Sequence, residues 1–358
     1  MPELYYIATK SKEIQYQAGL NIAANNNGFL IVKLENIHEY YNDNDKIWKV
    51  TLPSDNGLRK TINLGENVWI ANRIILGKSY SLYDPKTYLE LHIPYDHRIL
   101  DHASEKGKVH ILNGWRQAHI EHGLELKYTE NAIDLASCYN QLKVLDWWKK
   151  LHRETGLSLK YSCYAINSAS VYGKIQVLEW WKNSGLLLKY TKDAVDLASR
   201  YGKIAILNWW RQYCIDSGSK FRYSEYAIDG ASSYGKIEIL NWWEKYCAES
   251  DPQFNPTLKY SDDAIDGASG KGRLRSLNWW KKLYLKYGLQ LQYTNRAINL
   301  ASENGHEHVL EWWKRSCIYY GFALKYTEYA LEKATQNNHA HIVYWWIDSG
   351  LKIKYTKN

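Results

Sequence analysis

Residues 161–190 read YSCYAINSASVYGKIQVLEWWKNSGLLLKY, and variants of this segment recur through most of the chain. Its landmarks are an anchor tyrosine, a small Ala-Ser segment, a glycine and a pair of tryptophans. A fixed period of this length indicates a repeat array, in which each unit buries its apolar face against its neighbours. The anchor recurs at intervals of 29, 33 or 37 residues, at Tyr95, Tyr128, Tyr161, Tyr190, Tyr223, Tyr260, Tyr293, Tyr326 and Tyr355.

Tryptophan is concentrated at two positions of this repeat. Seven units carry Trp-Trp at the same distance from the anchor, as in Trp147-Trp148, and the first unit carries Gly114-Trp115. Of the 17 tryptophans, only Trp48 and Trp69 lie elsewhere. Because the pair keeps its place beside Val and Leu, we expect it to form the core rather than a surface on which ligands stack.

Each unit is predicted to form two helices joined by a tight turn. Thr129 and its equivalents are good N-caps for the first helix. The second helix should vary in length by about one turn, because Gly185 closes it sooner after the tryptophan pair than Gly156 does. In the longest unit, Pro252 and Pro256 predict a loop over residues 249–257. The first helix ends at a position that only Gly or Asn occupies, as a left-handed cap requires: Gly107, Asn140, Gly173, Gly202, Gly235, Gly272, Gly305 and Asn338.

The first 92 residues lie outside the repeat. Alternation over residues 47–52 and 69–76 predicts two strands, and residues 34–41 predict a short helix. Turn-forming residues at 55–57 and 25–28 indicate connections between such elements. We therefore expect residues 1–92 to form a small α+β domain and residues 93–358 to form the repeat array.

The repeat resembles the ankyrin repeat, with tryptophans in the paired leucine positions. The resemblance is carried by Ala169, Gly173, Trp180-Trp181 and Gly185, and it covers roughly residues 95–358. The Trp-Trp variant, with Tyr-Thr-x-x-Ala-Ile-Asp-x-Ala-Ser at residues 128–137, is similar to ankyrin proteins of mimivirus-like giant viruses. The segments at 48–53 and 72–78 resemble the N-terminal domains of the same viral families. One departure is the stretch from Gly185 to Gly202, which is four residues shorter than in the usual ankyrin repeat. The shortening implies a reduced β-hairpin finger in the loop after Gly185.

The fold class expected is therefore mainly α, an ankyrin-like helix-turn-helix solenoid of about eight repeats behind a small α+β domain. In ankyrin-like stacks, the residue just before the capping Gly faces the concave surface that holds partners. Tyrosine there supplies a large contact area at low entropic cost, although four diverged copies that pack on each other would look the same. We name six of these residues the tyrosine column and predict that it binds a protein partner: Lys106, Tyr139, Tyr172, Tyr201, Tyr234 and Lys271.

Two charged columns also follow the repeat. A basic column precedes the anchor tyrosines at Lys127, Lys160, Lys189, Arg222, Lys259, Lys325 and Lys354, and an acidic column comprises Asp101, Asp134, Asp196, Asp229 and Asp266. The array holds 36 basic and 28 acidic residues and so carries the whole formal charge of +8. The basic column could follow nucleic acid or another polyanion. Our default interpretation of both columns is a solvated surface.

We find no motif that predicts catalysis, a cofactor or a metal. The Gly267–Gly272 segment is the ordinary Ala-Ser and helix cap of its repeat, without the Lys-Ser/Thr pair of a phosphate loop. His119 and His122, like His339 and His341, have no evident third ligand, so we expect surface histidines. His38-Glu39 is too little for an acid–base pair.

Cysteine usage and hydropathy bear on location. The five cysteines, which include Cys214, Cys247 and Cys317, show no CxxC spacing, so we expect small buried side chains in a reducing compartment. No secretory signal and no apolar run long enough for a membrane span are visible. The sequence therefore predicts an intracellular, monomeric and non-catalytic scaffold for protein interactions, with polyanion binding as the alternative.

Overall fold

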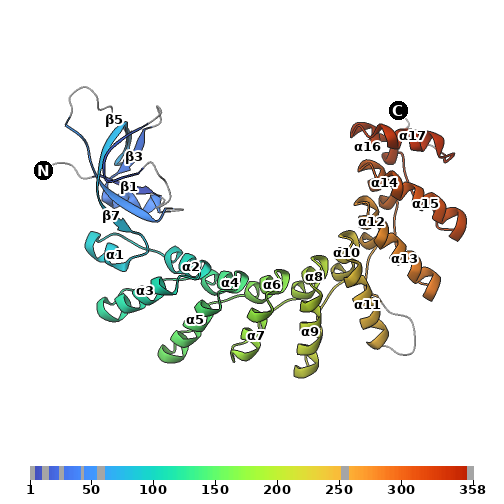
Figure 1. The fold of residues 1–358 in the computed structure, drawn as a ribbon, viewed down its shortest axis with the longest axis horizontal. Helices are drawn as coiled ribbons and strands as arrows, with labels where there is room; N and C mark the ends of the chain where they lie inside the picture. The colour runs from blue at the N-terminus through green and yellow to red at the C-terminus, as the bar shows by residue number, and fades with distance from the viewer. Residues whose placement is uncertain are drawn as a thin grey trace. The chain divides into compact units, whose positions relative to one another are not determined.

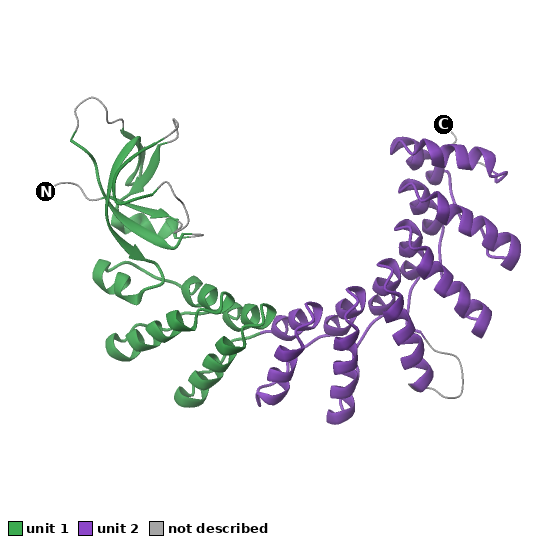
Figure 2. Ribbon diagram, in the orientation of Figure 1, with its two compact units in different colours: residues 1–161 green, residues 162–358 purple. Residues whose placement is uncertain are grey.

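A computed structural model describes residues 5–9, 16–23, 28–41, 44–54, 61–250 and 258–352. The chain forms two compact units, Met1–Tyr161 and Ser162–Asn358 (Figure 2). The first unit holds a β-sheet and five α-helices, and the second holds twelve further helices, counted over the described residues.

The sheet of the first unit has seven strands in the order β2-β7-β4-β1-β3-β6-β5, and neighbouring strands are antiparallel. A 3-10 helix, η1 (Leu34–Tyr40), lies where a short helix was predicted. Ile31, Ile47 and Ile74 are fully buried in the core of this domain. The strands are β1 (Tyr5–Thr9), β2 (Gly19–Ile22), β3 (Phe29–Val32), β4 (Lys46–Thr51), β5 (Thr61–Gly65), β6 (Val68–Ala71) and β7 (Arg73–Ser81).

The strand predicted over residues 47–52 is confirmed as β4, whereas the single strand predicted over 69–76 is wrong. The chain bends at Asn72, so that β6 pairs with β3 and β5 while β7 pairs with β2 and β4. The Asn72 carbonyl accepts a hydrogen bond from the Ala23 amide at 2.9 Å. The apolar pattern continues through the bend, so alternation could not reveal it. The turn predicted at 55–57 and residues 25–27 of the predicted loop lie outside the described residues.

Helix α1 (Pro85–Leu91) begins at the N-cap Asp84, whose carboxylate accepts from the Lys86 amide at 3.0 Å. Eight-residue first helices then alternate with longer second helices (Figure 1). The first helices are α2 (Arg98–Glu105), α4 (Asn131–Cys138), α6 (Tyr164–Val171), α8 (Asp193–Arg200), α10 (Tyr226–Ser233), α12 (Asp263–Gly270), α14 (Arg296–Glu303) and α16 (Tyr329–Gln336).

The second helices vary in length, as predicted. Six of them have 14 residues, and α7 (Ile175–Asn183) and α17 (Ala340–Asp348) have 9. No strand occurs in the described loops that join one helix pair to the next, in agreement with the reduced β-hairpin finger that was predicted. Of the loop predicted over residues 249–257, residues 249 and 250 instead end α11, and residues 251–257 lie outside the described residues. The longer helices are α3 (Val109–His122), α5 (Leu142–Thr155), α9 (Ile204–Ser217), α11 (Ile237–Ser250), α13 (Leu274–Tyr287) and α15 (Glu307–Tyr320).

The predicted left-handed caps are confirmed. The backbone φ is +72° at Gly173, and the other members of the Gly/Asn column are also positive, including +61° at Asn140. Asparagine tolerates this conformation better than other residues with a Cβ, which explains why it alone replaces glycine here. The cap turns the chain sharply and lets the second helix start two residues later.

The second tryptophan of each pair forms the core of the array. These residues are at most 2% exposed: Trp115, Trp148, Trp181, Trp210, Trp243, Trp280, Trp313 and Trp346. The buried indole N–H needs an acceptor, and the Ala-Ser serine of an earlier first helix supplies it, as in Trp210 Nε1 to Ser170 Oγ at 3.0 Å. The same bond joins Trp148 to Ser104, Trp243 to Ser199, Trp280 to Ser232, Trp313 to Ser269 and Trp346 to Ser302.

The first tryptophan is less buried but also links neighbours. Its indole N–H reaches the residue that precedes the previous pair, as in Trp242 Nε1 to Asn208 Oδ1 at 2.7 Å and Trp209 Nε1 to Glu179 Oε1 at 2.6 Å. Trp209 is half-buried and stacks on Tyr213 with ring centroids 5.4 Å apart. The predicted core position of the pair is therefore confirmed for its second member and only partly for its first.

We expect Trp210→Ala to lower the free energy of unfolding by about 3–5 kcal/mol, because it removes a fully buried ring and leaves the Ser170 hydroxyl without its donor. Trp209→Ala is the matched control and should cost clearly less. Urea unfolding followed by circular dichroism measures both. A Trp210→Ala protein with the wild-type unfolding midpoint would contradict the assignment of this ring to the core.

Candidate binding surface

The tyrosine column occupies one structural position, the C-cap of the first helices α2, α4, α6, α8, α10 and α12. All six residues have nearly the same backbone conformation, with φ between −85° and −105°. Their amides close the last helical turn, as in Tyr172 N to Ser168 O at 2.9 Å. The backbone therefore starts each of these side chains in the same local orientation relative to its own helix.

In the first unit, the column brings Lys106 and Tyr139 together. Lys106 Nζ lies 5.9 Å from the centre of the Tyr139 ring and 2.7 Å from a carboxylate oxygen of Glu105. Tyr139 is 54% exposed. The lysine thus already has a counter-ion, and the tyrosine ring is open to solvent.

In the second unit, Tyr172 and Tyr201 are 55% and 45% exposed, and Tyr234 is half-buried. The rings of Tyr201 and Tyr234 lie 6.4 Å apart, and Lys271 Nζ lies 3.7 Å from the centre of the Tyr234 ring. Among the described residues, no ring contact joins Tyr172 to Tyr201. The structure therefore joins Tyr201, Tyr234 and Lys271, and leaves Tyr172 as a separate exposed ring.

Arg200 belongs to this group, although the sequence analysis missed it. Its guanidinium lies 5.6 Å from the centre of the Tyr201 ring and 4.5 Å from that of Tyr234, and it donates a hydrogen bond to the Tyr234 hydroxyl. That bond and the charge of Lys271 lower the pKa of Tyr234. A signal was present in the sequence: Arg200 is the only cation at the position just before the column residues.

The acidic column is buried, so our interpretation of it as a solvated face is wrong. Asp229 is 4% exposed, and its two oxygens accept from the Ser261 amide at 2.9 Å and the Ser261 hydroxyl at 2.7 Å. The same pair of bonds joins Asp101 to Thr129, Asp196 to Ser224 and Asp266 to Thr294. Each acid therefore holds the residue just before the N-cap of a neighbouring first helix.

The predicted N-cap position is one residue too early, because the N-cap of α12 is Asp262 and Ser261 precedes it. Ser261 Oγ nevertheless accepts from the Asp263 amide at 3.2 Å while it donates to Asp229. Where the acid is replaced by Asn167, the amide group donates to Thr191 Oγ1 at 2.8 Å. The interaction thus persists with the direction of one hydrogen bond reversed.

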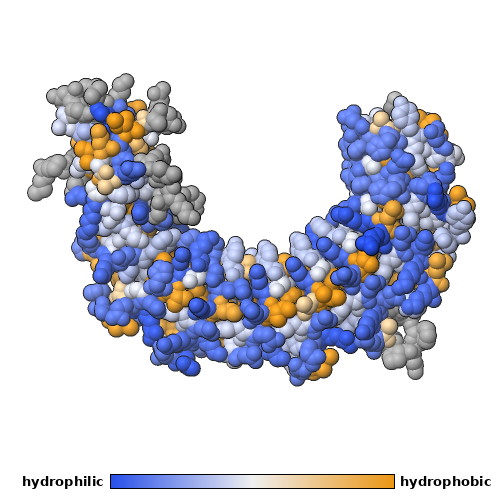
Figure 3. All heavy atoms as spheres, viewed as in Figure 1, coloured by the Kyte–Doolittle hydropathy of each residue, from blue (hydrophilic) through white to orange (hydrophobic). Residues whose placement is uncertain are grey.

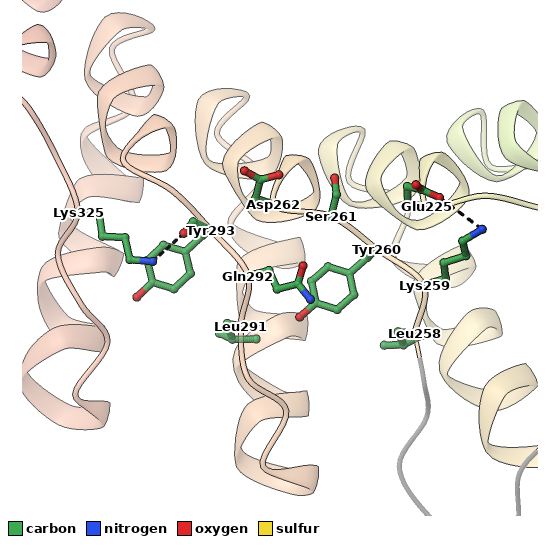
Figure 4. A pocket seen from close by; sticks show the side chains of 10 residues that line it. All are labelled: Glu225, Leu258, Lys259, Tyr260, Ser261, Asp262, Leu291, Gln292, Tyr293 and Lys325. Carbon is green, nitrogen blue, oxygen red and sulfur yellow. Dashed lines mark hydrogen bonds and ion pairs between the residues drawn. The ribbon is translucent and has the colours of Figure 1, made fainter.

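The basic column lies along the loops, and most of its members have partners within the chain. Figure 4 shows one part of it, a pocket of about 510 Å³ between the loops before α12 and α14. Lys325 Nζ donates to the Tyr293 carbonyl at 2.8 Å, and Lys259 Nζ lies 3.5 Å from Glu225 (Figure 4). Lys127 and Lys160 donate to the carbonyls of Tyr95 and Tyr128 in the same way. Lys354 lies outside the described residues.

The other candidate sites are ordinary parts of the fold. Gly267 and Gly270 belong to helix α12, and Gly272 is its left-handed cap. His119 and His122 are exposed, and Nδ1 of His119 lies 2.8 Å from the Leu124 carbonyl. Within the described ranges, no three His, Cys, Asp or Glu side chains gather as a metal site would require. The five cysteines form no disulfides; Cys214 and Cys247 are buried as expected, whereas Cys317 is half-buried.

Comparisons with known proteins identify a viral relative but no family. No family model matches the chain. An uncharacterized protein of Acanthamoeba polyphaga mimivirus is 35% identical over 115 residues, which are 29% of this chain and 36% of that protein. This chain therefore matches little more than a third of its relative's length. The resemblance to giant-virus proteins is confirmed at this level.

Among solved structures, the crystal structure of the human ASB11 ankyrin repeat domain is similar, with a TM-score of 0.36 and 13% sequence identity. The match covers 52% of this chain and 84% of that domain. None of the described helices is both long enough and apolar enough to cross a membrane.

Burial makes Asp229 sensitive to pH, because desolvation raises the pKa of its carboxyl from 3.8 to about 6. Between these two values the folded chain holds a proton that the unfolded chain releases, so acidification stabilises the fold. When the pH is lowered from about 7.5 to about 5.5, we expect the unfolding midpoint of the wild type to rise more than that of Asp229→Asn.

Asparagine fits this position, because Asn167 and Asn299 make the equivalent contacts with Thr191 and Thr327. Thermal unfolding at the two pH values measures the difference between the proteins. Equal shifts of the midpoint in both proteins would show that Asp229 does not titrate in this range.

Proposed function

We propose that the chain is a non-catalytic scaffold that binds another protein through the tyrosine column. In this proposal, the helix pairs from α2–α3 to α16–α17 are eight ankyrin-like units of the Trp-Trp type, and residues 1–92 form a separate domain. The chain would act as a monomer inside an infected cell and engage host or viral components. Cysteines that form no disulfides are compatible with a reducing compartment.

The observation that carries the proposal is the exposure of the column tyrosines. The anchor tyrosines, in contrast, pack against the array: Tyr128, for example, is 4% exposed and donates its hydroxyl proton to the Ser158 carbonyl at 3.1 Å. Tyr172 and Tyr201 occupy a repeated position yet keep about half of their surface in solvent. Exposed tyrosines offer apolar area and a hydroxyl at low entropic cost, as protein-binding surfaces do.

The surface of the second unit is also compatible with a protein partner. On the face drawn in Figure 3, the helices of the second unit present mostly hydrophilic surface interrupted by small hydrophobic patches. Interfaces that form and dissociate combine apolar anchors with a polar rim in this way. The mimivirus relative is itself uncharacterized and supplies no partner.

The contacts of the basic column weigh against the alternative of polyanion binding. Lys325 and Lys160 already donate to backbone carbonyls and lie 4.4 Å and 5.0 Å from the rings of Tyr293 and Tyr128. Lys259 already faces a carboxylate. A polyanion would have to compete with these contacts at each unit.

The double variant Tyr172→Ala, Tyr201→Ala should lose the partner without unfolding, because both rings are exposed and contribute little to the core. Affinity capture from the native host cell, quantified by mass spectrometry, compares it with the wild type. Tyr319→Ala on α15 is the matched control, since Tyr319 is 74% exposed but lies on a second helix. Capture of the same partner by the double variant at wild-type levels would refute the role of the column.

We expect that random DNA and RNA do not bind the chain, even at low salt. Fluorescence anisotropy with labelled oligonucleotides between about 50 mM and about 200 mM salt tests this, because release of counterions makes polyanion binding weaken steeply over that range. Binding that is strong at low salt and lost at high salt would instead support the alternative function.

A further inference from the structure

A pocket of about 320 Å³ lies beside the tyrosine column, between the first helices α8, α10 and α12. These helices are consecutive neighbours within the second unit (Figure 1). Arg200, Tyr234 and Lys271 line it where the helices end, and Asp193 and Asp263 line it where α8 and α12 begin. The pocket is therefore continuous with the group that the column forms in this unit.

Two glycines in the pocket lining let the neighbouring first helices pack closely. Gly230 and Gly267 occupy the fifth position of α10 and α12, where other first helices carry Leu135, Leu197 or Leu300. The absence of a side chain permits this packing, since a Cβ on Gly230 would lie 2.8 Å from the Cβ of Arg200. The result is a recess with backbone in its wall and charged groups at both ends.

The carboxylates around this pocket already have partners. Asp196 and Asp229 accept hydrogen bonds from Ser224 and Ser261. Asp263 accepts from Arg296 at 2.8 Å, and Asp193 accepts from the Thr191 hydroxyl at 3.0 Å. Asp263 is thus paired with a cation, whereas the other three carboxylates are held by neutral hydrogen-bond donors.

The two cations of the lining are not paired with any of these four carboxylates. Across the described residues, neither Arg200 nor Lys271 forms an ion pair with a carboxylate, and both lie against the Tyr234 ring instead. Nε of Arg200 is buried and has no hydrogen-bond partner in the described part of the chain. A buried donor without an acceptor is costly, so an arriving anion that reorients the guanidinium would satisfy it.

We propose that this pocket receives an acidic side chain of the protein partner, with its carboxylate bound by Arg200 and Lys271 beside the Tyr234 hydroxyl. A guanidinium can bind a carboxylate through two parallel hydrogen bonds, and the lysine adds charge. The inference rests on the proposed function and adds the chemistry of the partner: a segment with an Asp or Glu at one required position.

Selection of short random peptides on the full-length protein tests this inference. Selected peptides should share one Asp or Glu, and replacement of that residue by its amide should weaken binding at least about tenfold, which corresponds to the loss of one charge-assisted contact. The variants Lys271→Gln and Arg200→Gln, Lys271→Gln should show the same loss. Lys271 is exposed, so its single variant keeps the test valid if the double variant is less stable.

Lys150→Gln is the control, because Lys150 is an exposed lysine on the second helix α5, outside the tyrosine column, and is already paired with Glu154. It should bind the selected peptides like the wild type. A selection without a shared acidic residue, or equal binding by wild type and the Lys271 variants, would overturn the inference. Peptides that lose affinity for Tyr172→Ala, Tyr201→Ala but not for the Lys271 variants would overturn the acidic pocket and leave the proposed binding surface standing. Peptides insensitive to both sets of variants would overturn both.

Discussion

The hydrogen bond from a buried indole N–H to a serine of an earlier unit is the interaction on which the array depends. A tryptophan ring contributes more apolar area than a leucine, but its N–H must find an acceptor once water is excluded. Ser170 provides that acceptor for Trp210, and Ser199 provides it for Trp243. Because donor and acceptor belong to different units, no unit can satisfy its own core, and stability comes from stacking.

The beginning of the array shows the same constraint. Trp115 has no preceding repeat, and its indole N–H donates instead to the Tyr83 carbonyl at 2.9 Å, in the segment that follows β7. Its ring also lies 5.4 Å from that of Tyr88 on α1. The chain before the first repeat thus supplies both the acceptor and the packing surface that a previous unit would otherwise provide.

A second set of contacts fixes the first helices relative to each other and leaves one position open. The buried acids hold the residue just before the N-cap of the next first helix, as Asp229 holds Ser261, so they fix where that helix starts. The backbone of the C-cap residue closes the helix, while its side chain varies from Lys to Tyr to Asn. At Asn304 and Asn337 that side chain donates to a carbonyl of the previous first helix. A position with a constant backbone and a variable side chain is suited to recognition, since changing it does not disturb the stack.

The sequence by itself determined the elements that depend on local chemistry and on the repeat. The left-handed caps at Gly173 and Asn140, the shorter α7 and the buried Trp210 all follow from residue type and spacing, because helix termini and apolar periodicity are encoded within a few residues. The tertiary structure alone decided the burial of Asp229, the bend at Asn72 and the grouping of Arg200 with Tyr234 and Lys271. Each of these depends on a partner from a neighbouring repeat or strand, and a charged residue in a periodic column looks the same in sequence whether that partner or water satisfies it.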